Sequence, residues 1–258
     1  MVTADAIRAR AVGHLRALVG AVGFLTTIPL PHTAAAWEAF RRRPWILPAV
    51  GYPIGALVSL PVLVSPPGRV RGLGLVFAVL AVTGIVHLDG LTDVADALAV
   101  HGTTGDRVAA MEDAAVGVGG LLAGTVALLG LFVLGAALPE WSGAIRIAIG
   151  AEVAAKLAVL VVLARGSARH EGLGSALAES VGRRSMVPGV VLAAPVVASS
   201  PSLPGGLAVL AGGVAVGLGL EALSRDRFGG INGDVLGAAN ELARLVGLGV
   251  GVIAWTLS

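Results

Sequence analysis

Cysteine is absent from this 258-residue chain, which excludes disulfide bonds, thiolate catalysis and cysteine-ligated zinc. Charged side chains are scarce as well, at 13% of the residues, whereas soluble domains carry about a quarter. Apolar residues instead make up 56% of the chain, and the mean hydropathy is +0.89. Apolar stretches of roughly 15–23 residues recur, close to the length that crosses a hydrocarbon core of about 30 Å. The composition therefore predicts an all-α fold, a polytopic integral membrane helical bundle.

Lysine is nearly absent too, because the basic residues are 17 Arg and a single Lys. In a membrane protein this excess of positive charge describes topology first, since basic residues concentrate in cytoplasmic loops. We therefore expect membrane lipid, and no nucleic acid, as a partner. The 38 glycines suit close helix packing in lipid. No strand pattern precedes runs such as GVGG (117–120) or AGGVAVGLG (211–219), so these predict packing faces and not nucleotide-binding loops.

The apolar runs predict about seven transmembrane helices in a single membrane-embedded domain, residues 1–258. No internal repeat is evident, and no loop is long enough for a soluble domain. The expected spans are 45–64, 72–88, 118–138, 141–163, 186–200, 204–223 and 240–257. Segment 12–31 is ambiguous, because basic residues surround its start and PLP ends its helical pattern. It is expected to be an interfacial or re-entrant helix.

The distribution of arginine supports this placement of segment 12–31. With seven spans, the basic N-terminus shares its side with most loop arginines, namely Arg41–Arg43, Arg107, Arg165, Arg169, Arg183, Arg184, Arg225 and Arg227. Only Arg69 and Arg71 fall in an opposite loop. If segment 12–31 crossed the membrane, the basic N-terminus would lie on the outer side, against the usual distribution of positive charge. The sequence thus predicts an integral protein of the cell (inner) membrane of a prokaryote, with its acidic stretch facing the cytoplasm; whether it forms a homo-oligomer stays open.

That acidic stretch is GIVHLDGLTDVADAL, residues 84–98, which holds Asp89, Asp93 and Asp96. On a helix, steps of four and three residues place all three carboxylates on one face, over about 11 Å of axis. Carboxylates this close repel one another unless a cation intervenes. Oxygen ligands suit Mg²⁺, which takes one or two carboxylates plus substrate phosphate oxygens. The competing interpretation is a solvated helix end, but acids that alternate with small apolar residues at a membrane edge favour a functional site.

His87 precedes this cluster and is less clearly assigned. On an ideal helix it points about 200° away from Asp89, so the two could meet one ligand only if the helix broke near Gly90. A buried histidine between helices and a catalytic histidine are both consistent with this position.

Further candidate residues follow along the chain. GDRVAAMEDAAVGVGG (105–120) adds Asp106, Arg107, Glu112 and Asp113. FGGINGDVLGAANELARL (228–245) places Asp234 and Glu241 seven residues apart on one helix face, after glycines that can turn sharply and present N–H groups to an anion.

Two other charged spots are weighed differently. Glu152 and Lys156 stand four apart inside an expected span, where a mutually neutralising pair is the favoured interpretation. ARHEGLG (168–174), with Arg169 and Glu171, is either a plain loop or a phosphate contact.

Taken together, four stretches resemble the cobalamin synthase family, the membrane adenosylcobinamide-GDP ribazoletransferases. They are FLTTIPLP (24–31), HLDGLTDVADAL (87–98), ARHEGLG (168–174) and GGINGDVLGAANE (229–241), in the family's order. Three departures stand out: Ala97 replaces a usual Gly, Asn232 replaces a usual Thr, and MEDAAVG (111–117) lacks the polar residues that usually follow Asp113.

The resemblance implies a reaction in which a ribose hydroxyl of α-ribazole, or of its 5′-phosphate, attacks the phosphate attached to cobinamide, and GMP leaves. It implies Mg²⁺ held by Asp89, Asp93 and Asp96, and a proton acceptor among Asp89, Asp234 and His87. It also implies substrate contacts, which we expect from Asp113, Arg107, Arg169, Glu171, Gly233, Asp234 and Glu241. Phosphoryl transfer suits such a site, because it needs positioning and charge neutralisation more than covalent chemistry.

Other functions remain open at this stage. CDP-alcohol phosphotransferases and membrane prenyltransferases also place aspartates around Mg²⁺, but the first expect Ala-Arg after the Asp-Gly motif and the second expect two separate Asp-rich motifs. A small-molecule or cation transporter commonly shows inverted repeats and broken helices at mid-membrane. The lack of a repeat and the position of the acids at a membrane edge argue against a transporter.

Overall fold

The computed structural model describes residues 4–31, 33–64, 68–169 and 172–258. Within these ranges the regular elements are helices, and the one extended pairing is an isolated parallel bridge between Ala168 and Ile231. The helices are α1 (Ala4–Leu25), α2 (Ala34–Arg41), η1 (Pro44–Ile46), α3 (Leu47–Val58), α4 (Leu60–Val64), α5 (Arg69–Thr83), α6 (Val86–Ala99), α7 (Thr104–Met111), α8 (Val118–Ala136), α9 (Trp141–Arg165), α10 (Leu173–Ala178), η2 (Arg183–Ser185), α11 (Met186–Ala193), α12 (Pro195–Ser199), α13 (Leu203–Phe228) and α14 (Gly233–Thr256). The all-α membrane bundle expected from composition is confirmed.

The number of spans differs from the expected seven. Five described segments are long and apolar enough to cross a membrane: Pro44–Val64, α8, α9, α13 and α14. A sixth is possible if α5 and α6, bent by 98°, count as one broken span. Segment 186–200 does not qualify, because it forms helices of 8 and 5 residues that part before Pro195. At about 1.5 Å per residue, neither reaches across a core of about 30 Å.

The expected span 72–88 also ends early. α5 stops at Thr83, and Gly84 adopts φ 67°, a left-handed conformation that favours glycine. The chain then turns by 98° into α6. This bend decides which way the acidic stretch points, because every residue from Val86 to Ala99 lies after it.

α9 is the central helix of the bundle. It is buried along most of its length and packs against α3, α13 and α14. The contacts are backbone-close: a Cβ added at Gly51 in α3 would lie 2.6 Å from the backbone of Val153, and one at Gly213 in α13 would lie 2.5 Å from the carbonyl oxygen of Ala154. Small residues permit such approaches, which hold helices together in lipid. The glycine run at 211–219 is therefore a packing face, as predicted.

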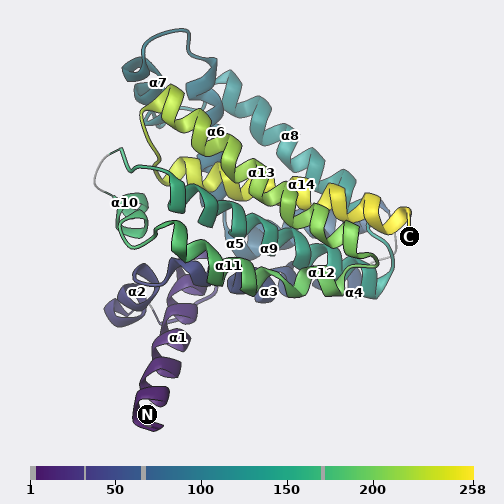
Figure 1. Ribbon diagram of the computed structural model, residues 1–258. Coiled ribbons are helices and arrows are strands. Elements are labelled where there is room, and N and C mark those ends of the chain that lie inside the picture. Colours follow the sequence, from purple (N-terminus) through teal and green to yellow (C-terminus); the bar gives the residue numbers. More distant parts are fainter. Residues whose placement is uncertain (1–3, 32, 65–67, 170–171) are drawn as a thin grey trace.

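Figure 1 shows α2, α7 and α10 toward one end of the bundle and α4, α12 and the C-terminus toward the other. The first end carries the arginines of α2 and α7 and those flanking α10, in line with the predicted charge asymmetry. At the other end, Arg71 is buried and donates to the carbonyl oxygens of Leu138 and Pro139, each at 3.0 Å. This contact fastens α5 to the turn before α9.

The N-terminal arm, α1 with α2, stands apart from the spans. α1 is not among the segments apolar enough to cross a membrane, and it projects from the bundle in Figure 1. α2 turns back along α1, and a Cβ at Gly20 would lie 2.3 Å from the carbonyl oxygen of Ala36. Glu38 of α2 accepts hydrogen bonds from Arg41 and Arg42, which hold the pKa of Glu38 at about 2, well below its ordinary value.

Candidate active site

Two sequence motifs meet where α6 crosses α14. A Cβ at Gly90 would lie 2.7 Å from the carbonyl oxygen of Asp234, and one at Gly237 would lie 3.0 Å from that of His87. Only glycine fits two backbones at this separation. α6 continues without a break through Gly90, so the break considered for His87 and Asp89 is not there. Gly90 serves the helix crossing, and the bend lies earlier, at Gly84.

A cavity of about 390 Å³ lies beside this crossing. At its polar end, the start of α6 contributes His87 and Asp89, and the start of α14 contributes Gly233 and Asp234. Asp89 and Gly233 are exposed, and Asp234 is half-buried. The rest of the wall is mainly apolar, and much of it comes from α1, α2, α3, α9 and α10. We call this part the apolar chamber; its residues are Phe24, Leu25, Phe40, Leu47, Val159 and Leu177.

His87 has an unsatisfied ring nitrogen at this polar end. Its Nδ1 is buried and has no hydrogen-bond partner among the described residues. Because the chain bends at Gly84, the first turn of α6 faces the cavity with Gly84, Val86, His87 and Asp89 together. His87 and Asp89 therefore share one cavity although they are about 200° apart around the helix axis.

The carboxylates near the crossing lack compensating charge. Asp93 lies within electrostatic reach of Asp89, Asp96 and Asp234. None of these four forms an ion pair with a described residue. Within the described ranges, no three acidic or imidazole side chains converge in a metal-binding arrangement. The Mg²⁺ site expected from Asp89, Asp93 and Asp96 thus stays a prediction.

Asp96 also connects two helices through hydrogen bonds. Its two carboxylate oxygens accept the backbone N–H groups of Gly117, at 2.7 Å, and Gly120, at 2.8 Å. These N–H groups belong to the start of α8, where a helix has donors without intrahelical partners and favours negative charge. Asp96 therefore fastens α6 to α8, in addition to any ligand role.

Asp234 is oriented by its neighbours. Asn232 caps α14 by accepting the N–H of Val235 at 3.0 Å, and its amide donates to an Asp234 oxygen at 2.8 Å. The same amide contacts the sulfur of Met111 at 3.3 Å, which brings the end of α7 to the site. Asp113, just beyond α7, is exposed and accepts the N–H of Ala115 at 2.9 Å.

The two arginines expected to contact substrate, Arg107 and Arg169, lie outside the cavity wall. Arg107 donates to the carbonyl oxygen of Gly102 at 2.8 Å, and its Nε is buried without a partner in the described part of the chain. Arg169 is exposed, and its backbone N–H donates to Ile231 at 3.1 Å, beside the glycine turn at 229–230. Glu171 lies outside the described residues.

Asp106, next to Arg107, takes part in the N-terminal cap of α7. It accepts the hydroxyl and the backbone N–H of Thr103, at 2.7 and 2.8 Å, and these hydrogen bonds lower the pKa of Asp106 below its ordinary value. The start of α7, the helix that carries Arg107, is therefore well capped.

Glu241 lies away from the cavity, in a buried ionic network between α9 and α14. Lys156 donates to Glu152 and to Asn240, each at 2.8 Å. Arg244 donates to Glu152 and to Glu241. The predicted Glu152–Lys156 pair is therefore confirmed, and it is half of a larger, charge-balanced group whose four charged side chains are at most 5% exposed.

The network also adjoins the site. His87 lies within electrostatic reach of Lys156, Arg244 and Glu152. Sequence reasoning missed Asn240 and Arg244. The available signal was a polar residue and an arginine next to Glu241 within an apolar run.

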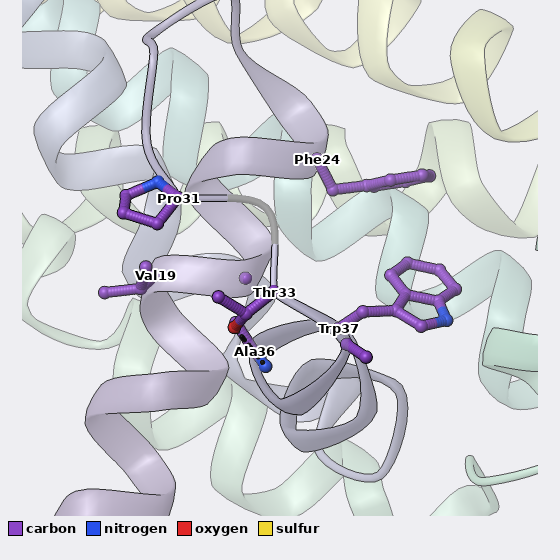
Figure 2. Close-up of a pocket in the computed structure, with 8 residues that line it drawn as sticks. Val19, Phe24, Pro31, Thr33, Ala36 and Trp37 are labelled. Carbon is purple, nitrogen blue, oxygen red and sulfur yellow. Dashed lines mark hydrogen bonds between the residues drawn. The ribbon is translucent and has the colours of Figure 1, made fainter.

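A second pocket, of about 260 Å³, lies between α1 and α2. In Figure 2, Phe24 and Trp37 lie on one side of it, and Val19 and Pro31 lie on the other. The Oγ of Thr33 accepts the N–H of Ala36 as the cap of α2. The described lining holds no acidic, basic or imidazole side chain, so this pocket offers no group for acid–base chemistry. Phe24 also lines the apolar chamber.

Comparison with known proteins identifies the family. Residues 17–252 match the family model described as cobalamin-5-phosphate synthase. The chain belongs to this family. The resemblance drawn from the four motifs is thereby confirmed.

Curated relatives agree over nearly the full length. A Halorubrum lacusprofundi protein named adenosylcobinamide-GDP ribazoletransferase is 44% identical, over 94% of this chain and 98% of its own. Proteins of the same name from Haloquadratum walsbyi and Methanocella arvoryzae are 38% and 34% identical, over 94% and 93% of this chain and 99% and 97% of theirs. No solved structure matches the chain.

Proposed function

We propose that this chain is a transferase that moves the adenosylcobinamide-phosphate group from adenosylcobinamide-GDP to α-ribazole, or to its 5′-phosphate. The products are GMP and adenosylcobalamin, or its 5′-phosphate. The names of the relatives support this reaction. The structural observation that carries it is the meeting of His87 and Asp89 with Asp234 at the polar end of one cavity.

The chemistry requires one bond to form and one to break. A ribose hydroxyl oxygen bonds to the phosphorus attached to cobinamide, and the bond from that phosphorus to the GMP oxygen breaks, so GMP leaves with the electron pair. The hydroxyl proton passes to a base within hydrogen-bond reach. Asp89, Asp234 and His87 line the cavity in which we expect this hydroxyl, and the unpartnered Nδ1 favours His87 for this role.

The donor set fits Mg²⁺. Carboxylates without ion-pair partners gather from two helices, and Mg²⁺ characteristically takes one or two protein carboxylates and completes its shell with water and phosphate oxygens. Asp89 and Asp93 would hold the ion, because the oxygens of Asp96 already accept two N–H groups. When bound, Mg²⁺ supplies charge neutralisation at the diphosphate and at the departing GMP oxygen.

The remaining site predictions follow from position. Gly233 begins α14 and leaves open space at the cavity, which suits close approach of substrate. Arg107 belongs to α7, whose last residue, Met111, contacts Asn232, and the backbone of Arg169 bonds to Ile231. We assign both arginines to the phosphates of the GDP group. We place this end of the bundle on the cytoplasmic side of the cell (inner) membrane, since most loop arginines gather there.

The test is GMP release by detergent-purified protein given adenosylcobinamide-GDP, α-ribazole 5′-phosphate and Mg²⁺. We expect Mg²⁺-dependent release that is lost in Asp89→Asn and kept in the control Asp226→Asn, an exposed aspartate on α13. Release that survives Asp89→Asn would move the essential carboxylate to Asp234. No release from folded protein would overturn the proposed function.

A further inference from the structure

The apolar chamber differs in chemistry from the polar end of the same cavity. Its wall is built from two phenylalanines, Phe24 and Phe40, and from aliphatic side chains of four helices. Phe40, Leu47, Val159 and Leu177 are at most 5% exposed. The two phenylalanine rings are tilted by 45° with centroids 5.9 Å apart. Such a wall favours a planar apolar ring.

The threonine hydroxyl groups of the cavity do not offer hydrogen bonds to a ligand. All three hydroxyl groups donate to backbone carbonyl oxygens: Thr26 to Val22, Thr27 to Ala81 and Thr83 to Val79. Each hydroxyl has a single proton, so none is left for a ligand. The ionisable side chains among the described lining residues are His87, Asp89 and Asp234, and they come from α6 and α14, whereas the apolar chamber comes from other helices.

This division discriminates between the ring systems of the two substrates. Guanine carries donors and acceptors around its edge, and burying each without a partner costs roughly 1–3 kcal/mol. The amide-rich corrin ring is larger and more polar still. The aromatic base of α-ribazole is a fused two-ring system with little polar edge, and a cavity of about 390 Å³ is within the usual range for such ligands.

We propose that the apolar chamber is the binding subsite for the aromatic base of α-ribazole. This inference rests on the proposed function and adds an orientation to it. With the base against Phe24, Phe40 and Leu177, the attached ribose lies toward Asp89 and Asp234, where its hydroxyl must react. The chamber would thus select the acceptor by its base and orient the ribose hydroxyl for reaction.

The test fills the chamber and measures binding apart from catalysis. Leu177→Trp narrows the chamber from α10, and Leu122→Trp is the matched control, because Leu122 is 60% exposed on α8. Binding is measured by calorimetry without Mg²⁺ or the cobinamide substrate. We expect Leu177→Trp to lower the affinity for α-ribazole at least ~10-fold, because the ring no longer fits the apolar pocket. The control should bind α-ribazole like the wild type, and the KM for adenosylcobinamide-GDP should stay within about twofold in both.

A second variant covers the case in which the tryptophan prevents folding. Leu177→Ala enlarges the chamber, so the preference should move from α-ribazole itself toward analogues whose base carries bulkier ring substituents. Unchanged α-ribazole affinity and unchanged base preference in the folded variants would overturn the subsite.

Other outcomes separate the subsite from the function. If Leu177→Trp raised only the KM for adenosylcobinamide-GDP, or abolished guanosine binding, the chamber would hold the nucleotide and the subsite proposal would fall while the transferase stood. If wild-type protein released no GMP and bound no α-ribazole, the proposed function itself would fail.

Discussion

Replacing Glu152 by glutamine tests the buried ionic network. Glu152 is 1% exposed and accepts hydrogen bonds from Lys156 and Arg244, which are themselves at most 1% exposed. The substitution keeps the shape but leaves two buried cations with one carboxylate, Glu241. Removing one partner of a buried ion pair lowers the free energy of unfolding by about 3–5 kcal/mol, because the remaining charge is neither paired nor hydrated.

The assay is thermal unfolding in detergent, with Glu140→Gln as the matched control. Glu140 precedes the same helix but is exposed and makes no side-chain capping bond. At roughly 2–4 °C per kcal/mol for a chain of this size, Glu152→Gln should lower Tm by roughly 6–20 °C. The control should stay within about 2 °C, as surface substitutions usually do.

A compensated variant sharpens the test. Glu152→Leu combined with Lys156→Met removes one charge of each sign and leaves Arg244 paired with Glu241. Replacing a buried pair by apolar side chains is often neutral or stabilising, so this double variant should recover most of the lost Tm. A Tm for Glu152→Gln equal to that of the control, or a double variant less stable than the single one, would refute the electrostatic reasoning.

Three further outcomes are expected. Asp96→Asn should destabilise the protein by about 1–3 kcal/mol in chemical unfolding, since it weakens two charge-assisted bonds to α8, while Asp226→Asn should not; equal stability would contradict the anchoring role. Gly90→Ala should cut GMP release at least ~10-fold, because its Cβ forces α6 and α14 apart and misplaces reacting groups, whereas Gly219→Ala, where a Cβ meets open space, should be as active as the wild type. Carboxyl NMR should place the titration of Glu38 at about 2, so its contribution to stability is complete above its ordinary pKa and is lost as the pH falls through about 2; a midpoint at the ordinary value would show that its arginine pairs do not form in solution.

Much of the architecture could be predicted from local pattern. Apolar runs long enough for lipid predicted the membrane bundle, and the spacing of Asp89, Asp93 and Asp96 predicted one acidic helix face. The pair of Glu152 and Lys156 followed from a four-residue spacing inside an apolar run. These features depend on residues close in sequence, so helix geometry alone relates them.

Other features could not be predicted in this way. The bend occurs at Gly84, which is one of 38 glycines in the chain. Nothing in the neighbouring sequence marks this glycine as one with a positive φ. The anchoring of Asp96 requires the start of α8, and the burial of Glu241 requires α9 beside it. In both cases the partner is remote in sequence.

The sequence by itself determined that this chain is a membrane helical bundle and to which family it belongs. Hydropathy, charge asymmetry and residue spacing are properties of the unfolded chain as much as of the folded one. Only the tertiary structure decided which acids face the cavity, which lock helices together and which neutralise buried cations. Identical carboxylates acquire these different roles because close helix crossings at glycine set the neighbours, and hence the local charge and solvent, of each one.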